Sequence, residues 1–85
     1  MKIALACDHG AFEHKEAIKL HLLKKGHQVQ DFGTHNEESM DYPDTVYPAS
    51  CSVADASNDF GIVLCGTGIG ASIVANKVKG VRCAL

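Results

Sequence analysis

Several features that would assign this chain at once to a functional class are missing from its 85 residues. No apolar run approaches the ~20 residues that a membrane-spanning helix needs, and Asp8 interrupts the N-terminal apolar run too early for a secretory signal. The formal net charge is only −2, so there is neither a basic stripe for nucleic acid nor an acidic tail. These absences predict a cytoplasmic protein that binds neither nucleic acid nor membranes.

The cysteines and histidines lack the spacing of a metal or redox motif. There are four cysteines but no CxxC pair, and without a secretion signal we expect no disulfide framework. Cys7, Cys51 and Cys83 are interpreted as small buried apolar residues. His14 and His21 lie seven residues apart with no carboxylate at the spacing of a zinc site. The sequence therefore predicts no metal.

Short apolar runs alternate with segments of helical character, and 85 residues make one domain at most. We expect strands at residues 2–7, 29–32, 60–64 and 81–85, and helices at 11–25, 44–57 (or 48–57, with Pro48 in the first turn) and 68–79. This order predicts an α/β fold with a parallel sheet and helices on both faces. Because no covering helix follows the fourth strand, we expect the single domain (residues 1–85) to be truncated there, incomplete at its C-terminal end.

The most informative segment is Cys65-Gly66-Thr67-Gly68-Ile69-Gly70, between an expected strand and an expected helix. Backbone N–H groups and the helix dipole make such a turn a cradle for an anion, although three glycines can also serve only a tight turn. The turn lacks the GK[ST] of a nucleotide-triphosphate loop and the GxGxxG of a dinucleotide loop. Asp31 stands where a ribose-binding acid would, but the first turn has a single glycine, Gly10. We therefore predict a smaller anionic ligand.

A cysteine at a helix N-terminus has a lowered pKa, which suits Cys65 to act as a general base. The alternative is a covalent nucleophile, for which His9 is the one plausible base. Asp8 and His9 follow the first strand and are expected at the same sheet edge as Cys65. The alternative for them is a helix cap and an exposed side chain. Asp41-Tyr42-Pro43 either lies over that edge or is a simple turn.

Four segments together resemble the ribose-5-phosphate isomerase B family, in order and over the whole chain. They are Cys7-Asp8-His9-Gly10-Ala11-Phe12, Asp31-Phe32-Gly33-Thr34, Asp41-Tyr42-Pro43, and Cys65 to Gly70 with Ala75-Asn76-Lys77. The resemblance implies an aldose–ketose isomerase that interconverts ribose 5-phosphate and ribulose 5-phosphate without a cofactor. It also implies a Rossmann-like three-layer α/β/α fold and a homodimer with the active site at the interface.

The resemblance implies a role for each matching residue. Cys65 looks like the base that takes the C2 proton, and Thr67 like a hydroxyl that relays protons between two substrate oxygens. Asp8 and His9 resemble contacts to the sugar and phosphate, and Tyr42 a residue that lines the pocket. The substrate loop would be formed by the backbone amides of Gly66, Thr67, Gly68, Ile69 and Gly70.

Family members are longer, and their ring-opening histidine and phosphate-binding arginines have no counterpart here. We therefore expect these 85 residues alone to have little activity. Two alternatives stay open: a galactose-6-phosphate isomerase subunit, and a non-catalytic module that binds a sugar phosphate. Asp41 and the Asp-His-Gly-Ala-Phe run favour the ribose enzyme.

Overall fold

The computed structural model describes all 85 residues and contains one parallel sheet of three strands. The strands are β1 (Lys2–Cys7), β2 (Gln28–Asp31) and β3 (Phe60–Leu64), in the order β2-β1-β3. Leu5 of the central strand stands opposite Asp31 of β2 and Ile62 of β3. The carboxyl ends of all three strands therefore meet at one edge of the sheet.

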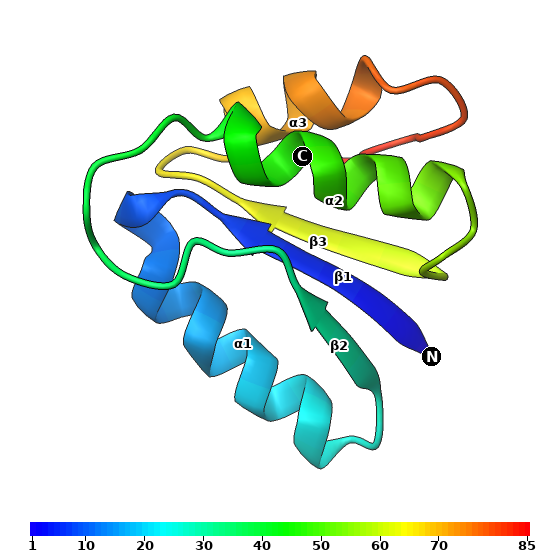
Figure 1. Ribbon diagram of the computed structural model, residues 1–85, viewed down its shortest axis with the longest axis horizontal. Coiled ribbons are helices and arrows are strands. Elements are labelled where there is room, and N and C mark those ends of the chain that lie inside the picture. Colours follow the sequence, from blue (N-terminus) through cyan, green and yellow to red (C-terminus); the bar gives the residue numbers. More distant parts are fainter.

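Helices cover both faces of this sheet (Figure 1). α1 (Phe12–Lys24), preceded by a single 3-10 turn (His9–Ala11), packs against β1 and β2 on one face. α2 (Pro43–Ala54) and α3 (Ile69–Asn76) lie on the opposite face, against β1 and β3. The expected Rossmann-like three-layer α/β/α architecture is confirmed.

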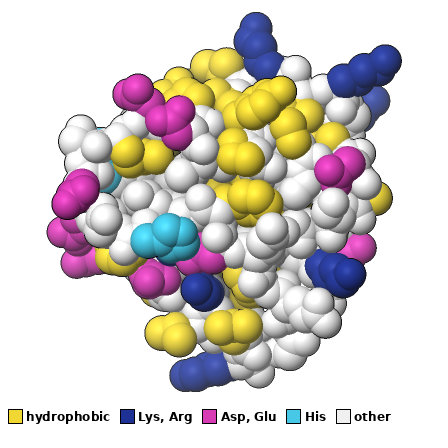
Figure 2. Space-filling model, viewed as in Figure 1, with side chains coloured by type: hydrophobic (Ala, Val, Ile, Leu, Met, Phe, Trp, Pro, Cys, Tyr) yellow, Lys and Arg dark blue, Asp and Glu magenta, His cyan; other side chains and the backbone are white.

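The core is small and built from small side chains. Ala4 and Ala6, in the buried part of β1 after Lys2, pack against Ala49 of α2. Several apolar side chains remain exposed over α2 and α3, where Figure 2 shows them gathered. No helix has both the length and the apolar character required to cross a membrane.

The observed helix starts correct one prediction about α2. Pro43, not Pro48, stands in the first turn of α2, where a residue without a backbone N–H is tolerated. Pro48 lies inside the helix on its exposed side, so water can reach the carbonyl group that it leaves without a partner. The predicted bounds of β1 and β3 are confirmed, and β2 begins one residue earlier than expected.

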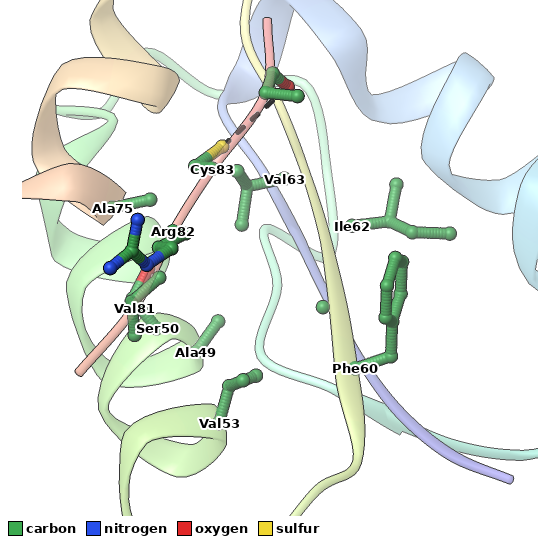
Figure 3. A pocket seen from close by; sticks show the side chains of 12 residues that line it. Ala49, Ser50, Val53, Phe60, Ile62, Val63, Ala75, Val81, Arg82 and Cys83 are labelled. Atoms are coloured by element: carbon green, nitrogen blue, oxygen red, sulfur yellow. Dashed lines mark hydrogen bonds between the residues drawn. The ribbon is translucent and has the colours of Figure 1, made fainter.

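The predicted fourth strand is wrong, because residues 81–85 do not pair with β3. Asn76, the last residue of α3, binds the backbone of Cys83 instead: Nδ2 donates to the Cys83 carbonyl at 3.0 Å, and Oδ1 accepts from the Cys83 N–H at 2.9 Å. These bonds use the backbone groups that a ladder would need. A largely apolar cavity of about 530 Å³ separates residues 81–84 from β3 and α2 (Figure 3).

Candidate active site

The ends of β1 and β3 are tied together at the carboxyl edge of the sheet. Asp8, the residue after β1, donates its backbone N–H to the carbonyl oxygen of Leu64 at 3.2 Å. Leu64 ends β3 and is followed directly by Cys65. The fold thus brings the Asp8-His9 and Cys65 segments, which are far apart in the sequence, to the same place.

Cys65 lies half-buried where α3 begins, and its Sγ accepts a hydrogen bond from the backbone N–H of Gly68 at 3.1 Å. Burial raises the pKa of this thiol, but the backbone N–H groups of Ala71, Thr67 and Gly68 and the Thr67 hydroxyl outweigh it, so the pKa is lower than usual. Cys7 shows the opposite, because burial raises its pKa. Of these two cysteines, Cys65 is the one whose surroundings favour the thiolate.

Two backbone N–H groups of the glycine turn are hydrogen-bonded to side chains of the same turn. Gly68 has a φ of 81°, the left-handed conformation that glycine adopts without strain. Thr67 Oγ1 accepts from the Ile69 N–H at 3.1 Å, as Cys65 does from Gly68. Apart from its two chain neighbours, no residue has a heavy atom within 4 Å of the position that a Cβ would take at Gly66. The open side of the turn is therefore at Gly66.

Tyr42 brings a third segment to this edge, because its ring packs over Gly70 in the first turn of α3. A Cβ at Gly70 would lie 2.6 Å from both Cε1 and Cζ of Tyr42, which only glycine avoids. Tyr42 directly precedes α2 and is half-buried. The segment before α2 thus reaches the start of α3.

Asp8 and His9 each accept one backbone hydrogen bond with one side-chain atom and leave a second polar atom without a partner in the chain. Asp8 Oδ1 accepts from the Ala11 N–H at 3.1 Å, which caps the short 3-10 turn. His9 Nδ1 accepts from the Met40 N–H at 3.2 Å, so the neutral ring carries its proton on Nε2. Asp8 Oδ2 and His9 Nε2 make no hydrogen bond within the chain and remain for a ligand.

Asp31 does not face this site as a ligand-binding acid. Its Oδ2 is held by Lys15 at 2.7 Å and Lys19 at 3.1 Å, and its Oδ1 accepts from the Gly33 N–H at 2.8 Å. No group of three or more His, Cys, Asp or Glu side chains is arranged to hold a metal ion. The apolar cavity beside β3 contains none of the predicted site residues.

Thr45 links two parts of the site, although nothing in its sequence context predicts this role. Its buried hydroxyl donates to the Cys7 carbonyl at 2.7 Å and lies 3.3 Å from the Tyr42 carbonyl. A threonine in the first turn of a helix is common, so the sequence carries no signal for this contact. Lys15 is different, because its position among the apolar residues of α1 is a sequence signal for a buried charge. The structure shows that this lysine is fully buried.

A thiol of lowered pKa before an open glycine turn, at the carboxyl edge of a parallel sheet, defines an α/β protein with a candidate acid–base site for a small anion. The sequence profile described as Ribose/Galactose Isomerase matches residues 3–85. The chain belongs to this family.

Individual relatives agree with this assignment. Ribose-5-phosphate isomerase B of Escherichia coli K12 is 46% identical over 81 residues, which are 95% of this chain and 54% of that protein. Galactose-6-phosphate isomerase subunit LacB of Clostridium acetobutylicum is 45% identical over 85 residues, 100% of this chain and 49% of that protein. The chain spans about half the length of the curated relatives it matches.

The fold agrees with a solved structure as well. Ribose-5-phosphate isomerase B of Clostridium thermocellum superposes with a TM-score of 0.94 at 50% identity, covering 96% of this chain and 55% of that one. The resemblance inferred from the four motifs is confirmed. Relatives named for ribose and for galactose phosphates occur together, so family membership alone does not select the sugar.

Proposed function

We propose that this chain carries the proton-transfer centre of an aldose–ketose isomerase for sugar phosphates, with ribose 5-phosphate and ribulose 5-phosphate as substrate and product. The observation that carries the proposal is Cys65, whose sulfur is hydrogen-bonded at the start of α3 and whose pKa is lowered. A base near neutral pKa is what proton abstraction beside a carbonyl requires. Relatives named as ribose-5-phosphate isomerase B support the choice of substrate.

In the proposed reaction the Cys65 thiolate removes the proton from C2 of the open-chain aldose. The C–H electron pair forms the C1–C2 double bond, and the C1 carbonyl oxygen becomes an enediolate oxygen. Within residues 66–70, the N–H groups of Gly68 and Ile69 already bind Cys65 Sγ and Thr67 Oγ1, so the proposed donors for this oxyanion are the backbone N–H groups of Gly66 and Gly70. The Thr67 hydroxyl passes the O2 proton to O1, and the Cys65 thiol returns its proton to C1, which leaves the carbonyl at C2. No cofactor takes part.

The free atoms at the sheet edge supply the substrate contacts in this proposal. Asp8 Oδ2 accepts from sugar hydroxyls, and His9 Nε2 donates to the phosphate or the ring oxygen. The Tyr42 ring forms a wall beside Gly70. Covalent catalysis by Cys65 is less well supported, because the lone pair on His9 Nδ1 already accepts the Met40 N–H.

We also propose that residues 1–85 form part of one cytoplasmic domain and that two copies associate near the site. Ile69 and Ile73 of α3 are 53% and 52% exposed, and they lie one helical turn apart beside the glycine turn. An exposed apolar pair at this place favours a contact between copies. The homodimer expected from the family resemblance would bury it.

Two alternatives have specific support. A galactose-6-phosphate isomerase subunit is favoured by the 45% identity to LacB. A non-catalytic sugar-phosphate module is compatible with the open Gly66 side of the glycine turn, which can hold an anion without any proton transfer. Comparing kcat/KM for ribose 5-phosphate, allose 6-phosphate and galactose 6-phosphate separates the two isomerases. Binding without conversion identifies the module.

The experiment that tests the proposal is the Cys65→Ala variant. Since the chain spans about half of its relatives, turnover is assayed both for the 85-residue chain and for a chimera in which it replaces the matching part of the Escherichia coli relative. The chain alone is expected to be nearly inactive and the chimera active. Cys65→Ala should lower kcat of the chimera by about 10²–10⁴-fold with little change in affinity. Cys51→Ala is the matched control, and equal loss in both variants, or in neither, would remove Cys65 as the base.

A further inference from the structure

A buried ion pair lies outside the chemistry described so far. The side chain of Lys15 is fully buried, and its Nζ lies 2.7 Å from Oδ2 of Asp31, whose side chain is 9% exposed. Lys19, on the next turn of α1, adds a second contact at 3.1 Å from a more exposed position. A buried ion pair is costly to desolvate and is often no more stabilising than apolar residues of the same size. Its presence in so small a core indicates a role other than overall stability.

The second carboxylate oxygen of Asp31 links the ion pair to the turn that follows β2. Asp31 Oδ1 accepts the N–H of Gly33 at 2.8 Å. The Gly33 carbonyl in turn accepts the Cys7 N–H at 2.7 Å, and the Thr34 N–H donates to the Cys7 carbonyl at 3.0 Å. The turn after β2 therefore hydrogen-bonds both the N–H and the carbonyl group of Cys7, at the end of β1.

This contact continues into the candidate active site. Cys7 directly precedes Asp8, and the Asp8 N–H binds the carbonyl of Leu64, the residue before Cys65. We propose that the Lys15–Asp31 pair is a positioning device for the site: it orients one Asp31 oxygen toward Gly33 and so sets Asp8 relative to Cys65. That this positioning serves catalysis rests on the proposed function.

The charge states agree with this geometry. Burial raises the pKa of Asp31, but hydrogen bonds from Lys15, Gly33 and Lys19 outweigh it and the net pKa is lowered. Burial lowers the pKa of Lys15, but Asp31 and then Glu16 outweigh it and the net pKa is raised. Both partners are therefore charged at neutral pH, and Lys15 holds Asp31 Oδ2 so that Oδ1 stays on Gly33.

A pair of double variants tests the proposal in the 85-residue chain. Lys15→Met/Asp31→Leu replaces the pair by apolar side chains and removes the acceptor for Gly33. Lys15→Met/Asp31→Asn is the matched variant, because the amide oxygen of Asn keeps that acceptor without charge. Measurements are urea unfolding, amide hydrogen exchange at Gly33 and Asp8, and titration with ribose 5-phosphate followed by NMR.

In the Leu variant we expect amide exchange at Gly33 and Asp8 to quicken about tenfold, shifted resonances of Asp8 and His9, and several-fold weaker binding of ribose 5-phosphate. The Asn variant keeps the acceptor for Gly33 but lacks the lysine that orients it, so all three properties should lie between those of the Leu variant and those of the native chain. Full recovery in the Asn variant would show that Lys15 is not needed and would overturn the proposal. Native exchange and native Asp8 resonances in the Leu variant would overturn the proposal, as would equal changes in both variants. If the Leu variant does not fold, Lys15→Met alone is measured, and unchanged exchange at Gly33 there would overturn it too. If the native chain binds no ribose 5-phosphate, the titration is repeated with the chimera described above; no binding there counts against the proposed function, while the exchange data still decide the positioning role.

Discussion

Two cysteines at neighbouring strand ends show how far the surroundings decide the chemistry of one residue type. Cys7 is the last residue of β1, fully buried, and the backbone turn after β2 surrounds it. Cys65 comes one residue after the end of β3, where backbone N–H groups of the glycine turn and of the first turn of α3 donate to its sulfur. Burial raises the pKa of Cys7, which has a single backbone donor, Thr34, whereas several donors together lower the pKa of Cys65.

At this scale we predict the pH dependence of thiol alkylation. Alkylation requires the thiolate, so a lowered pKa moves the rise in rate for Cys65 to lower pH than for an ordinary cysteine. Cys7 should stay unreactive in the folded chain, because it is buried and its pKa is raised. Timed labelling with iodoacetamide over a pH series, read by peptide mass spectrometry, measures both. In urea both cysteines should show the same pH profile of alkylation. If Cys65 in the folded chain shows that unfolded profile too, its pKa is not lowered by the fold.

At the scale of elements, the N-terminus of α2 is fastened to the end of β1 by one hydroxyl group. Thr45 donates to the Cys7 carbonyl at 2.7 Å, and its Cγ2 would lie 3.6 Å from a Cβ at Gly33. Tyr42 precedes this turn and reaches Gly70 of α3. A single helix start thus sets the spacing between the turn after β2, the end of β1 and the start of α3.

Thr45→Val should therefore cost stability although it keeps the shape of the side chain. The Cys7 carbonyl keeps its bond from the Thr34 N–H, so we expect a loss of about 1 kcal/mol in the free energy of unfolding. Thr45→Ser retains the hydroxyl and should lose less. Urea unfolding of the two variants gives the comparison, and a Ser variant less stable than the Val variant would show that methyl packing, not the hydrogen bond, matters here.

At the scale of the whole molecule, apolar surface is incompletely covered. Only 16 of the 85 residues are buried, and Phe60 on β3 is 56% exposed. A cavity of about 530 Å³ lies between β3, α2 and residues 81–84, because that segment is held by Asn76 instead of pairing with β3 (Figure 3). A molecule of this kind should bind an apolar dye.

We expect 8-anilinonaphthalene-1-sulfonate to fluoresce with the folded chain. Val81 lines the cavity, so Val81→Phe should fill part of it, lower the dye signal and raise the urea midpoint. Val78→Phe adds the same side chain at a position outside the cavity lining and serves as the control. If Val81→Phe leaves both dye binding and stability unchanged, the cavity is not the dye site.

Much of the framework could be predicted from local patterns. After Lys2, β1 is an uninterrupted apolar run that ends at Asp8, and β3 is one that ends at the Cys65-Gly66 pair, so their bounds needed no tertiary information. The run at residues 81–85 is also mostly apolar, with Arg82 the exception, and it misled the prediction because the side chain of Asn76 competes for its backbone. The four motifs likewise indicated the family, since their order and residue types are local properties.

By itself the sequence determined the alternation of strands and helices, the parallel sheet and the place of the glycine turn after β3. These follow from apolar periodicity and from turn residues, which act over a few positions. Only the tertiary structure decided that Tyr42 covers Gly70, that His9 accepts from Met40 and that Lys15 and Asp31 meet in the interior. Such contacts join residues far apart in the chain, and their energies depend on burial and distance, which exist only once the sheet has assembled.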